Sequence, residues 1–175
     1  MSEITTLKEK HLEDAAALVC ARYKTLRECV PIMPPRYEEA NVILPMLDHL
    51  IKNSPGVVAL QGSRLVGFLS GLVIKLLGQR CAYSPEWAHG VELEAGPRAD
   101  DEMYARLSAQ WIADGCGLHA VTLLANDRPG IEGWQWLGFG FVGVDGIRAL
   151  NPVEGLPAQV EVRQAGLEAA ATVSS

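Results

Sequence analysis

The feature that most constrains the fold is the apolar stretch GVVALQGSRLVGFLSGLVIKLL, which spans residues 56–77. Two strand-like runs are separated by Gln61-Gly62-Ser63, and a short glycine-containing spacer between such runs is typical of a β-hairpin. The second run is long and apolar, and Gly67 and Gly71 interrupt it. Glycine inside a strand indicates a bend or a close approach of another backbone. The chain is therefore expected to be built around a β-sheet.

Further strands and amphipathic helices are expected on both sides of this hairpin. Apolar residues repeating every three to four positions predict the helices, and short apolar runs between turn signals predict the strands. The expected helices cover residues 11–26, 37–52 and 100–117, and residues 131–138 are expected to form a short helix or a turn. The additional strands cover residues 3–8, part of 79–94, 118–125 and 139–150. In the third helix, acids in the first turn suit the helix dipole, and Gly115 suits the C-terminal cap.

The order of these elements is β, α, α, β, β, β, α, β, α, β, which predicts one α/β (α+β) domain. Hairpin strands come first and a single βαβ crossover follows, so the sheet should be mixed, with helices on its faces. A length of 175 residues fits one domain with a substantial core. Residues 1–150 should form this domain. Residues 151–175 read as the end of the last strand and a linker-like tail.

Composition excludes several classes of function. A formal net charge of −6 argues against a general nucleic-acid or anionic-membrane surface, because both require basic patches. No apolar run reaches the roughly 18 residues of a membrane span, and no leader sequence opens the chain. The four cysteines are scattered, which favours reduced thiols in a cytoplasm. Cys116 and His119 form one Cys-x-x-His pair without further ligands, so no metal site is expected.

Three stretches of the sequence together resemble the GNAT superfamily of acyl-CoA-dependent N-acyltransferases. ITTLKEKHLEDAAAL is similar to the opening strand and helix of that family, and VVALQGSRLVGFLSG is similar to its second and third strands. VTLLANDRPGIEGWQWLGFGF resembles its fifth strand, the following short helix and the Gly-Phe that opens the last hairpin. The resemblance covers roughly residues 4–150 and rests on element order and local pattern. It implies a mixed, mostly antiparallel central sheet with helices on both faces.

The resemblance also implies where an acyl donor such as acetyl-CoA would bind. In the family, strands four and five splay apart, and the pantetheine arm bonds to the backbone of strand four, while a glycine-rich loop before the next helix holds the diphosphate. The cofactor-binding residues that this implies here are Leu93, Glu94, Ala95, Arg98, Asn126 and Trp134. The acyl acceptor would be a small-molecule amine or a peptide amine.

Two features depart from the family pattern. The loop EAGPRADDEMYARL contains no Gly-x-Gly, and it places Asp100, Asp101 and Glu102 where a diphosphate would approach the helix. Like charges within a few Å cost about 1–4 kcal/mol at effective dielectric constants between water and a protein surface. In addition, Trp134 stands where many family members place a tyrosine that protonates the thiolate, and an indole cannot deliver that proton.

Glu86 is the residue that the resemblance favours as general base, because it lies on or beside the fourth strand. The alternative interpretation of Glu86 is an exposed charge at the end of a strand. His89 follows three residues later and would share a face with Glu86 only in a helix. Tyr83 is a candidate proton donor, and so is Tyr104. For Trp134 and Trp136, packing in a core or an interface is favoured over contact with a ligand.

Two functional hypotheses follow from these observations. The first is an N-acyltransferase that moves an acetyl or similar group from a coenzyme A thioester to an amine. The second is a non-catalytic GNAT-like domain that acts as a homodimer or packs against a second GNAT-like domain, for which the altered loop is expected. A small-molecule sensor that uses the same cleft has no positive support in the sequence, although fold alone does not determine function.

Overall fold

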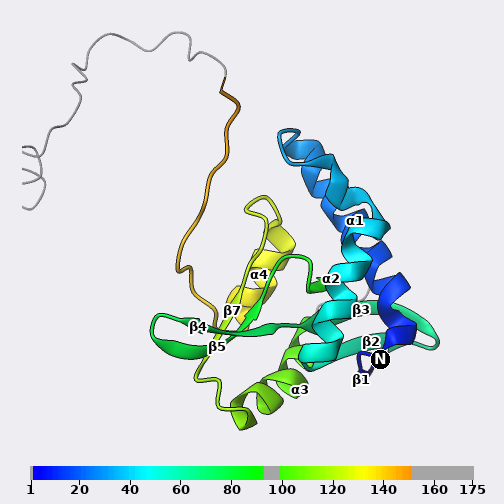
Figure 1. The fold of residues 1–175 in the computed structure, drawn as a ribbon, viewed down its shortest axis with the longest axis vertical. Helices are drawn as coiled ribbons and strands as arrows, with labels where there is room; N and C mark the ends of the chain where they lie inside the picture. The colour runs from blue at the N-terminus through cyan, green and yellow to red at the C-terminus, as the bar shows by residue number, and fades with distance from the viewer. Residues whose placement is uncertain (1, 93–98, 151–175) are drawn as a thin grey trace, which may run out of the picture.

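The computed structural model describes residues 2–92 and 99–150 of the chain (Figure 1). The strands are β1 (Glu3–Thr6), β2 (Gly56–Gln61), β3 (Arg64–Ser70), β4 (Leu72–Leu76), β5 (Gln79–Ser84), β6 (His89–Val91) and β7 (Leu118–Val121). The α-helices are α1 (Leu12–Cys29), α2 (Ala40–Asn53), α3 (Ala99–Ala113) and α4 (Arg128–Trp136). Two short 3₁₀ helices are η1 (Glu9–His11) and η2 (Pro35–Glu38).

The described strands form two sheets. One has the order β1-β2-β3-β6 and is antiparallel throughout. The other has the order β4-β5-β7, in which β4 and β5 are antiparallel and β5 and β7 are parallel. The expected mixed, mostly antiparallel arrangement is therefore confirmed.

Glycine determines both the central hairpin and the break that follows it. Gly62, with φ of 65°, lies in the turn between β2 and β3, as predicted. The expected single strand over residues 64–74 is wrong, because Gly71 separates β3 from β4 and the two strands belong to different sheets. A Cβ at Gly71 would lie 2.9 Å from the carbonyl oxygen of Tyr83 and 3.1 Å from the Trp111 ring. The close backbone approach predicted from this glycine is therefore present.

A second hairpin, which the sequence analysis missed, joins β4 to β5. Its two-residue turn consists of Leu77 and Gly78, whose φ values are 49° and 79°. Positive φ at both turn positions is the type I′ geometry, which matches the twist of the flanking strands. The stretch from Gln79, expected to be irregular before a fourth strand, begins with the strand β5.

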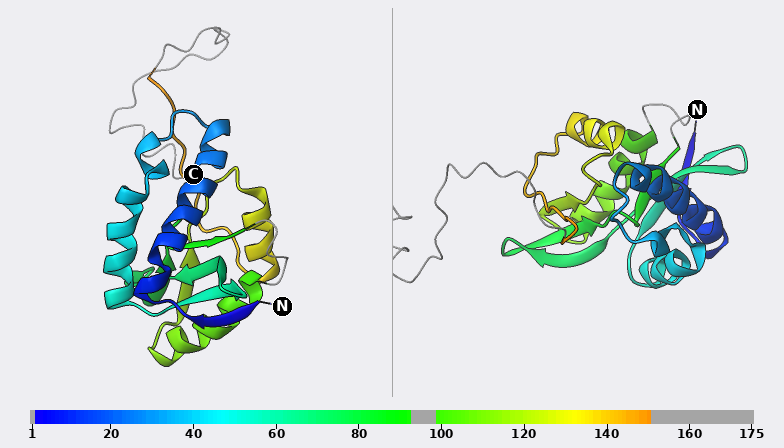
Figure 2. Two further views of the ribbon diagram at one scale, coloured as in Figure 1. Left: turned by 90° about the vertical axis from the view of Figure 1, so that its right-hand side faces the viewer. Right: turned by 90° about the horizontal axis from the view of Figure 1, so that it is seen from above.

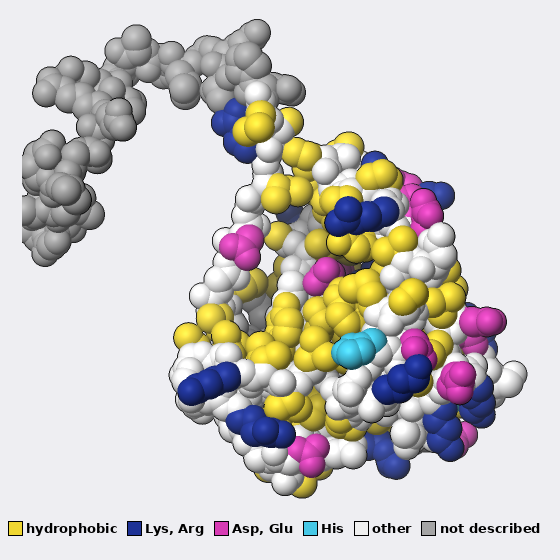
Figure 3. Space-filling model, in the orientation of Figure 1, with side chains coloured by type: hydrophobic (Ala, Val, Ile, Leu, Met, Phe, Trp, Pro, Cys, Tyr) yellow, Lys and Arg dark blue, Asp and Glu magenta, His cyan; other side chains and the backbone are white. Residues whose placement is uncertain are grey.

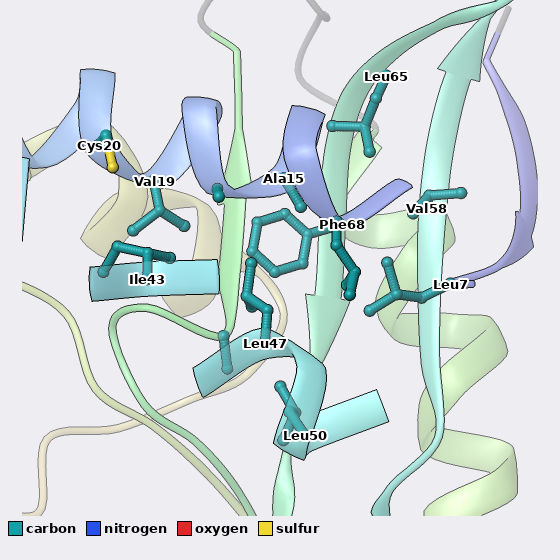
Figure 4. Close-up of a cluster of buried hydrophobic side chains, with 13 residues drawn as sticks. Leu7, Ala15, Val19, Cys20, Ile43, Leu47, Leu50, Val58, Leu65 and Phe68 are labelled. Carbon is teal, nitrogen blue, oxygen red and sulfur yellow. The ribbon is translucent and has the colours of Figure 1, made fainter. Parts of the chain in front are cut away.

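Helices cover both faces of the central strands (Figure 2). On one face, Phe68 of β3 and Val58 of β2 pack against α1 and against Leu47 and Leu50 of α2 (Figure 4). On the other face, the alternate residues of β2 and β3 pack against three buried side chains of α3. These are Met103, Leu107 and Trp111. In β2 this alternation follows from the two-residue period of a strand, whereas in β3 the period shifts at the irregularity opposite Ala59 and Leu60.

The two strands next to the expected cofactor cleft diverge. β5 runs beside β7 as far as Ser84 and Val121, whereas β6, which continues the chain after β5, pairs with β3. The hydrogen bonds from Ser70 N to Ala88 O and from Glu92 N to Val66 O show which edge of β6 faces β3. By the alternation of an antiparallel ladder, the backbone polar groups of His89 face the opposite way, towards the gap. The splay predicted from the family resemblance is confirmed.

The ends of α3 and α4 have the glycine caps that their sequences predict. Gly115 has φ of 81°, and the following Cys116 N–H donates to the carbonyl of Trp111. Gly138 has φ of 88°, and Phe139 N–H donates to the carbonyl of Trp134. Both patterns are Schellman caps, which satisfy carbonyls that the helix leaves unpaired.

The expected last strand over residues 139–150 is wrong. The structure shows no regular secondary structure there, and the side chains from Gly140 to Leu150 are exposed. Glycine recurs in this segment at positions 140, 143 and 146, which weakens a strand because each glycine loses the most backbone entropy and offers no side chain to pack. Leucine, valine and phenylalanine side chains consequently remain in contact with solvent.

No helix within residues 2–92 and 99–150 is both long and apolar enough to cross a membrane.

Candidate functional site

A pocket lies between α1, α2 and the gap where the strands diverge; we call it the α1 pocket. Three helical segments form one wall, and the connection from β5 to β6, β6 itself and the segment between β7 and α4 form the other. Its lining residues are Val19, Arg22, Tyr23, Leu26, Tyr37, Ile43, Glu86, Trp87, His89, Leu123, Leu124 and Asp127. Figure 3 shows hydrophobic side chains gathered over the middle of this face of the molecule, with an acidic group among them.

The α1 pocket is narrow and largely apolar. The space open to the centres of water-sized molecules is ≈ 30 Å³. A water occupies roughly 10–15 Å³ on this measure, so the pocket has room for the end of a ligand rather than for a large one. Of the lining residues, all but four are aliphatic or aromatic.

Glu86 stands in the four-residue connection between β5 and β6. Ala88 N–H donates to the carbonyl of Pro85, which closes a tight turn, and the carbonyl of Ala88 accepts from Ser70 N–H of β3. This turn interrupts what would otherwise be one long strand and leaves Glu86 exposed at the pocket. Both Glu86 and His89 line the pocket although they do not share a helix, so a turn rather than a helix brings them together.

His89 is buried, and its ring is neutral. Burial and, to a smaller extent, the positive charge of Arg22 lower the pKa of His89 to about 4, against the opposing effects of the Thr122 carbonyl and Asp127. Nε2 lies 3.0 Å from the Thr122 carbonyl, and because a carbonyl oxygen can only accept, Nε2 must carry the proton. Nδ1 faces Arg22 Nη1 at 3.5 Å. His89 thus bridges the gap between β6 and the segment after β7.

Arg22 and Asp127 form an ion pair that joins α1 to α4 across 105 positions of sequence. Asp127 is buried and also caps α4, because its Oδ1 accepts from Gly130 N–H at 3.2 Å. A Cβ at Gly130 would lie 2.8 Å from Arg22 Nη2. Glycine at this position therefore leaves room for the guanidinium to reach the start of α4.

Asp100 lies in the first turn of α3, close to this pair. Its carboxylate is partly buried, and Oδ2 lies 3.8 Å from the position a Cβ would take on Gly133 of α4. Burial raises the pKa of Asp100 from 3.8 to about 6, Arg22 acts against this rise, and Asp101 and Asp127 add to it. The acids expected in the first turn of α3 are present, and one of them points into the space between α3 and α4.

Aromatic rings fill the space behind the gap. Trp134 is buried, and its ring meets those of His89, Tyr104 and Phe139 edge to face, at centroid distances of 5.9, 5.7 and 4.9 Å. Edge-to-face contacts of this kind are favourable because the positive ring edge meets the negative ring face. Trp134 therefore packs in the core, as favoured from the sequence, whereas Trp136 is 83% exposed and does not.

Two other predicted site residues, Tyr83 and Asn126, do not line the α1 pocket. The hydroxyl of Tyr83 lies 2.8 Å from that of Thr122. The amide of Asn126 donates to the carbonyl of Leu26 at 2.7 Å, which ties the start of α4 to the end of α1. The remaining predicted cofactor-binding residues, Leu93, Glu94, Ala95 and Arg98, lie outside the described residues.

Four pocket residues were not predicted from the sequence: Arg22, Asp127, Tyr23 and Tyr37. A local signal existed only for Asp127, because Asp-Arg-Pro-Gly places an acid directly before a helix that has proline in its first turn. Arg22, Tyr23 and Tyr37 lie on helical segments, where the spacing of apolar residues indicates only which face of the helix is buried. No group of three or more His, Cys, Asp or Glu side chains in the described part of the chain is arranged to hold a metal ion.

The described residues fit one part of an acyl-CoA and not another. The free edge of β6, with the backbone groups of His89 and Val91 facing the gap, suits the amide-bearing pantetheine arm, which could pair with it as a strand would. The first turn of α3 does not suit the diphosphate, because Asp100, Asp101 and Glu102 place negative charge there. The described residues therefore suit the pantetheine arm of a thioester better than its diphosphate.

Several solved structures share this fold. A transcriptional regulator from Bacillus halodurans aligns with a TM-score of 0.61 at 18% identity, over 85% of this chain and 99% of that one. An aminoglycoside N-acetyltransferase in complex with CoA aligns with a TM-score of 0.59 at 16% identity, over 86% and 96%. A GCN5-related N-acetyltransferase from Ralstonia eutropha aligns with a TM-score of 0.59 at 14% identity, over 89% and 100%. The chain therefore has the fold of the GNAT acetyltransferases.

No protein-family model matches the sequence, and no curated protein matches it.

Proposed function

We propose that this chain is an N-acyltransferase, which transfers an acetyl or similar group from a pantetheine thioester such as acetyl-CoA to an amine held in the α1 pocket. The observation that carries the proposal is the position of Glu86. Its carboxylate lines a pocket that adjoins the free edge of β6, so an acceptor and a thioester arm could meet at the gap between the strands. The four unpaired cysteines agree with a cytoplasmic enzyme.

The transfer needs one proton acceptor and a well-placed amine. An alkylammonium has a pKa of about 10, so it must first lose a proton, and the carboxylate of Glu86 takes it directly or through a water. The neutral nitrogen attacks the thioester carbonyl carbon, the N–C bond forms and the C–S bond breaks. The sulfur leaves with the bonding electron pair and is protonated by the second N–H proton, which yields an amide and a thiol.

Residues around Glu86 position the acceptor rather than react with it. The Arg22–Asp127 pair and His89 hold α1, β6 and α4 together at the pocket, and Trp87 borders it. Tyr83 is a candidate to relay the second N–H proton to the sulfur, and so is Tyr104. The hydroxyls of both are held by side-chain partners, Thr122 for Tyr83 and His119 for Tyr104.

Thiol release from acetyl-CoA in the presence of a panel of amines tests the proposal. Glu86→Gln keeps the shape of the side chain and removes the base, so we expect kcat/KM to fall about 100-fold. Glu132→Gln, which changes an exposed residue of α4 outside the pocket, is the matched control and should have no effect. Equal rates for Glu86→Gln and the unchanged protein would remove Glu86 from the mechanism. The absence of thiol release with every amine would contradict the enzyme proposal.

A non-catalytic GNAT-like domain is the second candidate, and the first turn of α3 favours it. Three acids where the family binds a diphosphate, together with Trp134 where it often has a tyrosine, are expected if catalysis has been lost. The chain would then act by packing against a copy of itself or a second GNAT-like domain, with exposed apolar residues such as Trp136 and Phe141 at the interface. Calorimetry with acetyl-CoA and sedimentation equilibrium distinguish the candidates. Dimerisation without heat of binding would support the second.

A further inference from the structure

We infer that the α1 pocket selects an acceptor with one ammonium group on a slender apolar stem, and that it discriminates against polyamines. This inference rests on the proposed function, because it names the class of amine that the same site would take. It follows from the charges, walls and width of the pocket. The binding of the amine can be measured without any acyl donor, so the inference and the proposed reaction can fail separately.

The charged groups of the pocket leave one negative charge for a ligand. Arg22 and Asp127 neutralise each other in their ion pair. His89 donates its single ring proton to the Thr122 carbonyl and carries no charge. Glu86 forms no ion pair or hydrogen bond with any residue in the described part of the chain. The single negative charge that remains in the pocket therefore matches one ammonium group.

The walls beside Glu86 are suited to a cation on an apolar stem. Tyr23 and Tyr37 meet edge to face with ring centroids 5.6 Å apart, and Trp87 follows Glu86 directly. Aromatic faces attract an ammonium group and also pack against methylene groups. Leu26 completes the wall on α1. A stem of methylene groups would thus be buried against apolar side chains, while the ammonium group at its end reaches the carboxylate of Glu86.

A second positive charge would find no partner in the pocket. The far side is formed by aliphatic residues, including Leu123 and Leu124, and burying an unpaired ammonium group there is costly. At the rim, the guanidinium of Arg36 already covers one face of Tyr37 at 4.9 Å from the ring centroid. A second ammonium group near that ring would meet a like charge. With only ≈ 30 Å³ open to water-sized molecules, the pocket also has little room for the water that a second ammonium group would need to keep around it.

Three probes of six heavy atoms test this selectivity: n-pentylamine, 1,4-diaminobutane and pentan-1-ol. Pentylamine has the ammonium and the stem, the diamine replaces the terminal methyl by a second ammonium, and the alcohol lacks charge. Each is titrated into the full ¹⁵N-labelled chain and followed by amide chemical shifts. We expect pentylamine to bind at least tenfold more tightly than either of the others, with the largest shifts at pocket residues.

Variants then locate the binding. Glu86→Gln should weaken pentylamine binding at least tenfold and leave pentan-1-ol binding unchanged, while Glu132→Gln should alter neither. Equal or tighter binding of the diamine would overturn the inference, and so would pentylamine binding that survives Glu86→Gln. Absence of pentylamine-induced shifts at concentrations up to its solubility limit would also overturn it.

The outcomes separate the inference from the proposed function. Selective pentylamine binding without thiol release from acetyl-CoA would support the inference and contradict the acyltransferase. Thiol release with 1,4-diaminobutane and none with pentylamine would support the acyltransferase and overturn the inference.

Discussion

Replacing Asp100 with asparagine is expected to stabilise the protein at neutral pH. Burial raises the pKa of this carboxyl from 3.8 to about 6, with Asp101 and Asp127 adding to the rise and Arg22 opposing it. A raised pKa means that the folded state disfavours the ionised form. The resulting contribution to stability is fully present below about pH 3.8 and is lost as the pH rises through about 6. Above pH 6 the protein therefore retains a partly buried charge that asparagine would remove.

The size of the effect follows from the pKa and from the exposure of the side chain. A rise from 3.8 to about 6 corresponds to an upper bound of about 3 kcal/mol at 1.36 kcal/mol per pKa unit. Because the carboxylate is partly exposed, solvent screening reduces this to about 1–2 kcal/mol. Asparagine also gives up the favourable interaction of an acid with the helix N-terminus, about 0.3–1 kcal/mol. The net gain should be about 1 kcal/mol, or a rise in Tm of about 2–4 °C for a chain of this size.

Urea unfolding from pH 4.5 to pH 8 measures this effect directly. The free energy of unfolding of Asp100→Asn should exceed that of the unchanged protein by an amount that grows between pH 4.5 and pH 7. Asp101→Asn is the matched control, because it changes an exposed acid in the same helical turn; it loses the interaction with the helix dipole and relieves only the smaller repulsion of Asp100 by Asp101. Parallel stability curves for Asp100→Asn and the unchanged protein would refute the reasoning.

The same substitution should affect donor binding if acetyl-CoA approaches α3. Removing one like charge within a few Å of a diphosphate is worth about 1–4 kcal/mol, so the Kd for acetyl-CoA should fall at least about fivefold at pH 7.5. Isothermal titration calorimetry checks this. An unchanged Kd in Asp100→Asn would show that a bound diphosphate lies elsewhere.

Three further predictions concern pH and packing. Burial lowers the pKa of His89 to about 4, so its contribution to stability is present above about pH 6.5 and declines as the pH falls towards 4. His89→Gln should therefore flatten the acid limb of the unfolding curve. Gly71→Ala should cost about 1–3 kcal/mol in urea unfolding, because its Cβ would lie 2.9 Å from a backbone oxygen of Tyr83, whereas Gly90→Ala, with no neighbour nearer than 3.5 Å, should cost less. Phe68→Ala removes a fully buried ring and should lower the free energy of unfolding by about 3–5 kcal/mol; a loss below 1 kcal/mol would contradict the central position of Phe68.

Local chemistry accounts for the parts of the fold that the sequence predicts. The Gly62 turn, the helix faces, and the caps at Gly115 and Gly138 depend on residues a few positions apart, so their signals survive in a short window. The covering of both sheet faces follows from the alternation of side chains along the strands. The sequence predicts a bend at Gly71 in the long apolar run. It does not predict that the strands on either side of Gly71 belong to different sheets.

Glycine spacing explains the strand that does not form. Residues 139–150 are apolar enough to predict a strand. A strand also needs a partner strand to pair with, and ordering its backbone must be favourable in free energy. Repeated glycine lowers the free energy gained by ordering the backbone. The outcome also depends on pairing with a strand elsewhere in the chain, which no local pattern encodes. The type I′ turn at Leu77 and Gly78 is the opposite case, because a leucine with positive φ is tolerated where two strands already pair.

The sequence by itself determined the fold class and the central hairpin, and it favoured Glu86 as a base, because each of these rests on periodicity, turn chemistry or family resemblance. Only the tertiary structure decided that Glu86 shares a pocket with His89, and that Arg22 meets Asp127. These groups lie up to 105 positions apart, and their distances and charges depend on how four elements pack around one gap. A charge pair, a neutral histidine and a single unpaired carboxylate are properties of that packing, so no stretch of sequence contains them.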